Sequence, residues 1–211
     1  MHIHKLGHCC LVIEVNNKRI MTDPGTFSTL QNEEKNIDII LFTHEHQDHF
    51  HLDSLKIVLK NNPQAKIITN TAVGKLLDAE KIPYAVLEHG DSKTEEGILI
   101  EGFGEKHAEI YKTWGQVQNT GYFIENKLFY PGDAFVNPGK PVDILALPVA
   151  GPWMKISEAI DYVYALKPRI AFPVHDAIMK NPNMFHKLFT MLLPESGVEF
   201  VSMVEGDSHD F

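Results

Sequence analysis

The chain has 211 residues, a length that fits one compact α/β domain better than two. Its 28 acidic and 19 basic residues give a net charge of -9, and the mean hydropathy is -0.15. Nucleic-acid binding requires clustered Lys and Arg, so an acidic chain with scattered lysines is not expected to bind nucleic acid. No apolar run approaches the ~18 residues of a membrane span, and the start lacks a signal-peptide pattern. We therefore expect no membrane contact and a cytoplasmic location.

The first half of the chain is predicted to hold strands followed by strand–helix units. A continuous apolar run over 37–44 indicates a strand buried on both faces. Cys9 and Cys10 are neighbours in an expected strand and point to opposite faces, so no disulfide between them is expected. The other elements predicted here are strands over 2–6, 9–15, 19–23 and 66–69 and amphipathic helices over 52–62 and 71–81.

The second half repeats this order. Apolar runs over 142–149 and 169–175 indicate two more buried strands. The other predictions are short strands between 82 and 131, a helix over 157–167 with Ser157 as N-cap, and a strand over 198–203. Asn181-Pro182 is expected to open a last helix that buries Met184, Phe185, Leu188, Phe189 and Leu192. Two β-rich halves, each followed by helices, predict two face-to-face sheets with helices outside, in one domain over 1–211.

The strongest chemical signal is the cluster His44-Glu45-His46-Gln47-Asp48-His49, which directly follows the apolar run 37–44. Strand ends are where α/β folds place their sites. Imidazole and carboxylate are ligands of zinc and of manganese, iron and nickel. One catalytic metal usually takes three protein ligands, so three imidazoles and a carboxylate favour two metal ions. The alternative interpretation is a solvated polar turn.

Three single residues also fall at the ends of apolar stretches. His107 follows the stretch 97–103, Asp133 lies in Tyr-Pro-Gly-Asp, and His175 ends the run 169–175. Each alone is a weak signal, because a histidine at a strand end is more often an ordinary hydrogen-bonded residue. Their shared position makes them candidate ligands as a set.

Taken together, these residues make the chain resemble the metallo-β-lactamase superfamily over essentially its whole length. The resemblance implies an α/β fold built as a four-layer αββα sandwich. It implies a pair of divalent cations, Zn2+ first, with Mn2+, Fe2+ or Ni2+ as alternatives. It also implies that one cation is held by His44, His46 and His107, a second by Asp48, His49 and His175, and that Asp133 bridges them.

Shorter motifs resemble one branch of that superfamily, the one that contains L-ascorbate-6-phosphate lactonase. They are KLGHCCLVIE, TDPG, PGDA, LALPVAGPWMKISEA and FPVHDA. Asp133 stands where the antibiotic-hydrolysing members usually carry Cys, so β-lactamase activity is not expected. His46 stands where the flavodiiron-type redox members carry Glu.

Four more residues are candidates around the centre. Asp23 either accepts a hydrogen bond from a ligand histidine or serves as an ordinary turn residue. His8 lies near the site mouth in the resembled branch, although a strand-end polar residue is the favoured interpretation. Trp153 and Lys155 either line the pocket, with Lys155 meeting an anionic group, or are a packed indole and a solvated amine. The histidines expected at the surface are His2, His4, His89, His186 and His209.

The expected function is metal-dependent hydrolysis of an ester-like bond in a small molecule, a lactone or a phosphorylated metabolite. Two cations that share a water would lower its pKa toward ~7, and the hydroxide would attack while Asp48 orients it. The alternatives are phosphodiester hydrolysis of a nucleotide or lipid, iron-dependent oxidation, and a metal-binding domain without turnover. The sequence does not indicate an oligomeric state.

Overall fold

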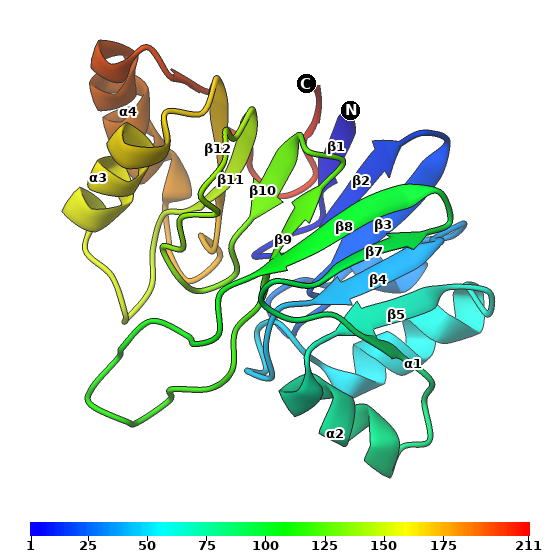
Figure 1. The fold of residues 1–211 in the computed structure, drawn as a ribbon. Coiled ribbons are helices and arrows are strands. Elements are labelled where there is room, and N and C mark those ends of the chain that lie inside the picture. Colours follow the sequence, from blue (N-terminus) through cyan, green and yellow to red (C-terminus); the bar gives the residue numbers. More distant parts are fainter.

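The computed structural model describes all residues, 1–211, and arranges them as helices, sheet, sheet and helices (Figure 1). The strands are β1 (His2–Lys5), β2 (Leu11–Val15), β3 (Lys18–Thr22), β4 (Ile39–Phe42), β5 (Lys66–Thr69), β6 (Ala85–Val86), β7 (Ser92–Glu95), β8 (Ile98–Phe103), β9 (Gly121–Ile124), β10 (Leu128–Tyr130), β11 (Ile144–Pro148), β12 (Ile170–Val174), β13 (Glu199–Phe200) and β14 (Ser208–Asp210). The helices are α1 (Leu52–Asn61), α2 (Thr71–Ala79), α3 (Ile156–Leu166) and α4 (Pro182–Leu192), with short 3-10 helices at Leu30–Glu33 and Leu193–Ser196. The predicted αββα sandwich is confirmed.

Each sheet has seven strands, in the orders β14-β1-β2-β3-β4-β5-β6 and β13-β12-β11-β10-β9-β8-β7. Strands β3, β4 and β5 are parallel to one another, as are β10, β11 and β12. Strands β4, β11 and β12 are buried along their whole length, as their unbroken apolar sequences predicted. Because parallel strands end at a common edge, the loops that follow them lie close together.

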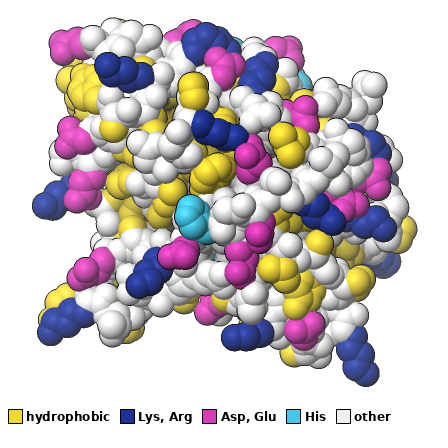
Figure 2. All heavy atoms as spheres, in the orientation of Figure 1, with side chains coloured by type: hydrophobic (Ala, Val, Ile, Leu, Met, Phe, Trp, Pro, Cys, Tyr) yellow, Lys and Arg dark blue, Asp and Glu magenta, His cyan; other side chains and the backbone are white.

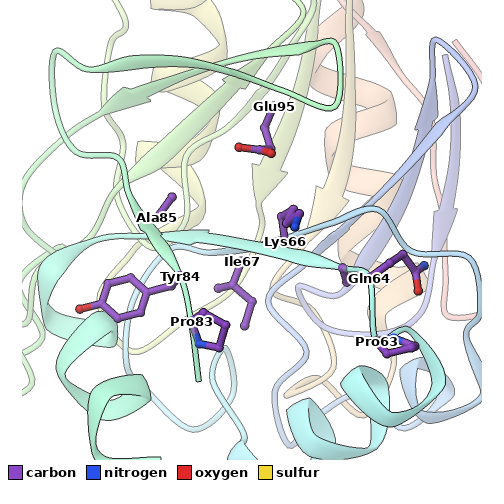
Figure 3. A pocket seen from close by; sticks show the side chains of 9 residues that line it. Pro63, Gln64, Lys66, Ile67, Pro83, Tyr84, Ala85 and Glu95 are labelled. Carbon is purple, nitrogen blue, oxygen red and sulfur yellow. The ribbon is translucent and has the colours of Figure 1, made fainter. Parts of the chain in front are cut away.

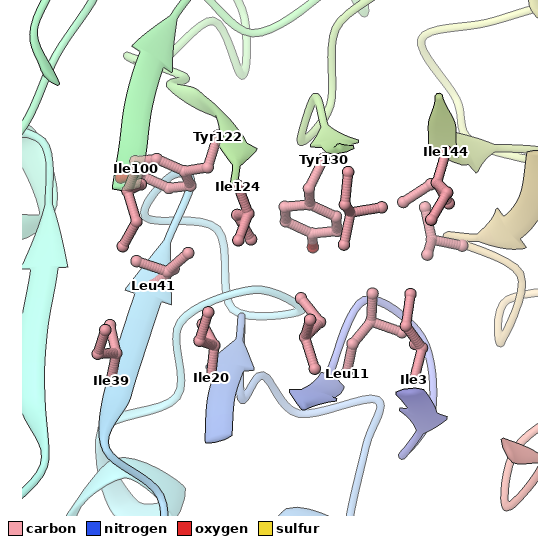
Figure 4. Packing of buried hydrophobic residues seen from close by; sticks show 14 of the residues in the cluster. Ile3, Leu11, Ile20, Ile39, Leu41, Ile100, Tyr122, Ile124, Tyr130 and Ile144 are labelled. Carbon is pink, nitrogen blue, oxygen red and sulfur yellow. The ribbon is translucent and has the colours of Figure 1, made fainter. Parts of the chain in front are cut away.

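The main core lies between the two sheets (Figure 4). Ile20 and Leu41 of the first sheet face Tyr122 and Tyr130 of the second. A separate core joins the first sheet to α1 and α2, and another joins the second sheet to α3 and α4. These three apolar cores fix the positions of the strand ends that carry the candidate His and Asp ligands.

The two ends of the chain lie together, because β14 pairs with β1 and places Asp210 opposite His2. On the face shown in Figure 2, acidic and basic side chains are interspersed. None of the helices combines the length and apolar content needed to cross a membrane.

The buried face of α4 differs from its prediction. Phe189 is buried as expected, but three residues predicted in the core are 40–59% exposed: Met184, Leu188 and Leu192. The helix instead buries His186, which was predicted at the surface. The His186 ring lies 3.1 Å from Asp176 Oδ2 and 2.9 Å from Ser202 Oγ, so its burial leaves no polar atom unpaired.

The start of α3 also differs from its prediction. The helix begins at Ile156 with Lys155 as N-cap, and not with Ser157. The Glu158 carboxylate accepts the backbone N–H of Lys155 at 2.6 Å. A side chain from inside the first turn thus provides the cap, as in half of a capping box.

Candidate metal centre

The predicted ligands come together at the edge where the parallel strands end. The cluster 44–49 follows β4, Asp133 follows β10 and His175 directly follows β12, while His107 lies in the loop between β8 and β9. Their ligand atoms form two groups, each with all atoms within 4.8 Å of one another: His44, His46 and His107 in the first, and His8, Asp48, His49 and His175 in the second. The division into two groups is the one that the family resemblance implied, with His8 added.

Asp133 lies between the two groups. Its Oδ2 is 3.3 Å from Nε2 of His107 in the first group and 2.8 Å from Nε2 of His175 in the second. Its Oδ1 is 3.2 Å from Nε2 of His49. The carboxylate is buried, with 3% of its side chain exposed. One carboxylate that touches both groups is suited to bridge two cations.

Several nitrogen atoms of the centre are buried without any hydrogen-bond partner. They include Nε2 of His44 and His49 and both ring nitrogens of His175, and Asp133 Oδ1 also has no partner. Buried polar atoms left unpaired are costly and uncommon in folded proteins. Two ligands of one tetrahedral zinc, each about 2.0–2.2 Å from the ion, lie ~3.3 Å apart. The separations around Asp133 are close to that value, so the residues fit divalent cations.

The two carboxylates of the centre are held in their ionised form. Burial raises the pKa of Asp133, but the charges of His175 and His49 outweigh it and bring the pKa well below its ordinary value. Burial also raises the pKa of Asp48, but the neighbouring His8 ring and the charges of His49 and His175 outweigh it and bring the pKa below its ordinary value. Burial lowers the pKa of His8 to about 4. Metals bind ionised carboxylates and neutral imidazoles, so Asp133 and Asp48 already have the binding form. Burial lowers the pKa of His49, but the charge of Asp133 outweighs it and raises that pKa well above its ordinary value, so His49 would release a proton when a cation binds.

Asp23 accepts four hydrogen bonds beneath the centre. Its carboxylate receives the backbone N–H and the hydroxyl of Thr43 at 2.8 and 2.7 Å, the Tyr130 hydroxyl at 2.6 Å and Nδ1–H of His49 at 2.8 Å. Its backbone has φ +35°, a strained value for a residue with a side chain. Asp23 therefore orients His49, one of the two roles considered for it, and also accepts a backbone N–H.

Gly25 allows the Asp23 turn to approach the cluster loop. A Cβ on Gly25 would lie 1.9 Å from the carbonyl oxygen of Asp48, which is far inside van der Waals contact. Gly132 meets a similar limit, because a Cβ there would lie 2.4 Å from Asn119 Oδ1 and its φ is +66°. Glycine at these two positions is a requirement of close backbone packing.

Trp153 contacts the centre directly, whereas Lys155 does not. The Trp153 indole N–H donates to Asp133 Oδ2 at 2.9 Å, and its ring packs near His107 and His175. Lys155 is exposed at the N-terminus of α3. Trp153 is therefore a packed indole that also holds Asp133, which neither interpretation of the sequence included.

Two residues of the centre had no signal in the sequence. Asn119 is buried, donates to the Pro131 carbonyl and accepts the backbone N–H of Asp133, each at 3.0 Å. Cys9 was expected to be a buried small hydrophobe, and its thiol also lies within 4.8 Å of ligand atoms of His49 and Asp133. Both Cys9 and Cys10 are free, as predicted. Neither Asn119 nor Cys9 has a spacing that links it to the cluster, so only the fold reveals them.

Comparison with known proteins identifies the family. A family model described as "Beta-lactamase superfamily domain" matches residues 2–175, well over half of the chain. The chain belongs to the beta-lactamase superfamily. It is 35% identical over 184 residues to Protein Rv0786c of Mycobacterium tuberculosis, with 85% of each chain covered. It is 28% identical over 201 residues to UPF0173 metal-dependent hydrolase Ta0764 of Thermoplasma acidophilum, covering 86% of this chain and 88% of the relative.

Solved structures share the fold of this chain. A metal-dependent hydrolase from Parabacteroides distasonis has a TM-score of 0.79 and 25% identity, with 97% of this chain and 93% of that chain covered. Igni18, a metallo hydrolase from Ignicoccus hospitalis, has a TM-score of 0.79 at 22% identity, with 100% and 98% covered. The lactonase branch inferred from the shorter motifs stays a prediction.

The metal centre is distinct from a cleft at the start of β5. That cleft, of about 290 Å3, is lined by Pro63, Gln64, Ala65, Lys66, Ile67, Pro83, Tyr84, Ala85 and Glu95 (Figure 3). Lys66 begins β5, so the cleft lies at the amino end of that strand, away from the edge that carries the histidines. Its lining includes no histidine and none of the predicted site residues.

Proposed function

We propose that this member of the beta-lactamase superfamily hydrolyses an ester-like bond in a small molecule, a lactone or a phosphorylated metabolite, with two divalent cations of which Zn2+ is the first choice. The family match and the relatives make it a metal-dependent hydrolase. The bond class, the number and identity of the cations and a cytoplasmic location are the proposal.

One observation carries the proposal: unpaired imidazole nitrogens of two residue groups converge on a single buried carboxylate. His44, His46 and His107 would hold one cation, and Asp48, His49 and His175 the other. Asp133 touches residues of both groups and would bridge them. The unpaired atoms on both sides of Asp133 favour two cations over one.

A pair of divalent cations, when bound, supplies a strongly acidified water and stabilises negative charge on the substrate. The protein's own part is to hold and orient the reactants. Asp48 is the more accessible of the two carboxylates, with 22% of its side chain exposed against 3% for Asp133. Its lowered pKa keeps it ionised at neutral pH, so it accepts a hydrogen bond from the attacking water and orients it.

The proposal is tested with protein stripped by a chelator and reloaded with Zn2+, Mn2+, Fe2+ or Ni2+. Each form is assayed against a panel of chromogenic lactones, phosphomonoesters and bis-aryl phosphodiesters, with bound metal measured in parallel. We expect two equivalents of metal per chain and hydrolysis of lactones or phosphomonoesters that disappears on chelation and returns on reloading.

The matched variants are His46→Ala in the centre and His209→Ala on β14, far from it. Loss of turnover in the first and not in the second is expected. Turnover of phosphodiesters alone would contradict the proposed bond class. Two bound metals without turnover of any ester would support a domain without catalysis, and a stoichiometry of one would overturn the two-cation centre.

A further inference from the structure

His8 is a buried residue next to the other members of the second group. It occupies the turn between β1 and β2 and is fully buried. Its ring centroid is 4.0 Å from that of His175 and 5.3 Å from that of Phe27. Its backbone carbonyl also accepts the N–H of His175 at 2.9 Å, which helps to hold that residue at its strained φ of +61°. A polar ring in this position needs a role for each nitrogen.

The hydrogen bonds of His8 determine where its proton lies. Nδ1 accepts the backbone N–H of Ala177 at 3.2 Å. A neutral imidazole has one N–H donor and one acceptor nitrogen, so a ring that accepts at Nδ1 carries its proton on Nε2. Nε2 has no aligned partner and lies 3.4 Å from Oδ2 of Asp48. His8 therefore presents an N–H, and not a lone pair, to the second group.

Two of the candidate ligand histidines, His49 and His107, have the opposite arrangement. Nδ1 of His49 faces the Asp23 carboxylate at 2.8 Å, and Nδ1 of His107 faces the Ala108 carbonyl at 2.6 Å. Both partners accept hydrogen bonds only, so in their neutral form these rings carry the proton on Nδ1 and have a free lone pair on Nε2. Metal binding requires that lone pair. His49 and His107 can thus offer a lone pair to a cation, whereas His8 cannot. The His8 nitrogen nevertheless lies within 4.8 Å of the other ligand atoms of the second group.

We propose that His8 is a positioning residue, whose Nε2–H donates to Oδ2 of Asp48 and fixes the orientation of that carboxylate, and that it is not a fourth protein ligand of the second cation. The inference rests on the proposed function only in taking the centre to hold cations. Fixing Oδ2 from the buried side leaves the accessible side of Asp48 to face the attacking water.

The direct test is nitrogen NMR of the histidine rings in protein loaded with the spin-active isotope of Cd2+ in place of Zn2+. We expect cadmium–nitrogen coupling to His49 and His107 at Nε2, no coupling to His8, and an Nε2–H proton on His8. Coupling to a His8 nitrogen would overturn the inference. Absence of any bound cadmium would instead contradict the proposed function, so the two failures are distinguishable.

Two substitutions test the positioning role. His8→Leu removes the donor, while His8→Gln places an amide N–H near the same point. We expect His8→Leu to lower kcat about 10–100-fold with two zinc ions still bound, and His8→Gln to recover most of that loss. His51→Leu is the matched control, because the His51 ring bonds Ser54 outside the centre.

A one-metal stoichiometry in His8→Leu, not restored by His8→Gln, would mean that His8 is a ligand and would overturn the inference. Equal losses of kcat in the Leu and Gln variants with two zinc ions bound would also overturn it, since packing and not the donor would then be responsible. Thermal unfolding of each variant, measured alongside, identifies any loss that comes from the fold.

Discussion

Two buried polar clusters lie side by side in this protein and differ in how their atoms are paired. In the first, the Lys5 ammonium donates to Asp176 Oδ2 at 2.6 Å, to the Pro173 carbonyl at 2.9 Å and to the Met203 carbonyl at 3.2 Å. His186 completes that cluster through Asp176. In the second, the metal centre, Nε2 of His44, His49 and His175 have no hydrogen-bond partner.

The clusters contain similar residue types, and His175 of one is the chain neighbour of Asp176 of the other. Only the pairing separates a structural network from a candidate site. A closed network stabilises the fold through its own hydrogen bonds, whereas unpaired nitrogens are costly until a ligand binds them.

Removal of cations should have the largest effect, because it leaves several buried imidazole nitrogens of the metal centre without a partner. We expect a chelator to abolish hydrolysis and zinc to restore it. Zinc at 1,000 times its Kd should stabilise the fold by about 4 kcal/mol, measured as a rise in Tm during thermal unfolding. Asp133→Asn should lose most of that rise, and an unchanged Tm in the unsubstituted protein would contradict a cation site.

Lys5→Met should break the closed network. Removing one partner of a buried ion pair leaves the other charge uncompensated, so we expect the free energy of unfolding to fall by about 3–5 kcal/mol, measured by denaturant titration. Lys18→Met is the control, because Lys18 forms its two ion pairs, with Asp38 and Glu96, near the surface. It should lower the free energy of unfolding by less than about 1 kcal/mol. Equal losses of unfolding free energy in the two variants would contradict a stabilising role for the buried Lys5 network.

Asp23→Asn should lower the metal affinity of the centre. The amide places an N–H where the carboxylate accepts from His49, Thr43 and Tyr130. We expect zinc affinity at the second group to fall about 10–100-fold, measured by competition with a chromophoric chelator. Asp38→Asn, a carboxylate outside both clusters, should leave the affinity unchanged. A loss confined to the first group would contradict the assigned role of Asp23.

Arg169→Ala should have the smallest effect, because its ion pair with Asp143 lies at the protein surface. The Arg169 hydrogen bond lowers the pKa of Asp143 in the folded state. The pair therefore adds stability above the unfolded pKa of Asp, and this contribution is lost as pH falls through the folded value. We expect a cost below about 1 kcal/mol at pH 7 that vanishes in strong acid, measured by urea unfolding across pH. A cost that grows in acid would contradict this sign.

Much of the fold follows from local sequence patterns. The apolar runs 37–44, 142–149 and 169–175 became the buried strands β4, β11 and β12, because each run has the length and continuity of a strand covered on both faces. The face of α4 could not be predicted in this way. His186 is polar by composition, and only the distant partners Asp176 and Ser202 make its burial favourable.

The sequence by itself determined which residues are available to bind metal, because the cluster 44–49 carries its ligands within one loop at the end of a strand. It also determined the layered fold, since strand and helix periodicities are local properties. Tertiary structure alone decided how Asp133 is placed between the two groups and which nitrogen of each imidazole is free. Those properties depend on partners far along the chain, such as Ala177 for His8 and Asp23 for His49, which no local spacing encodes.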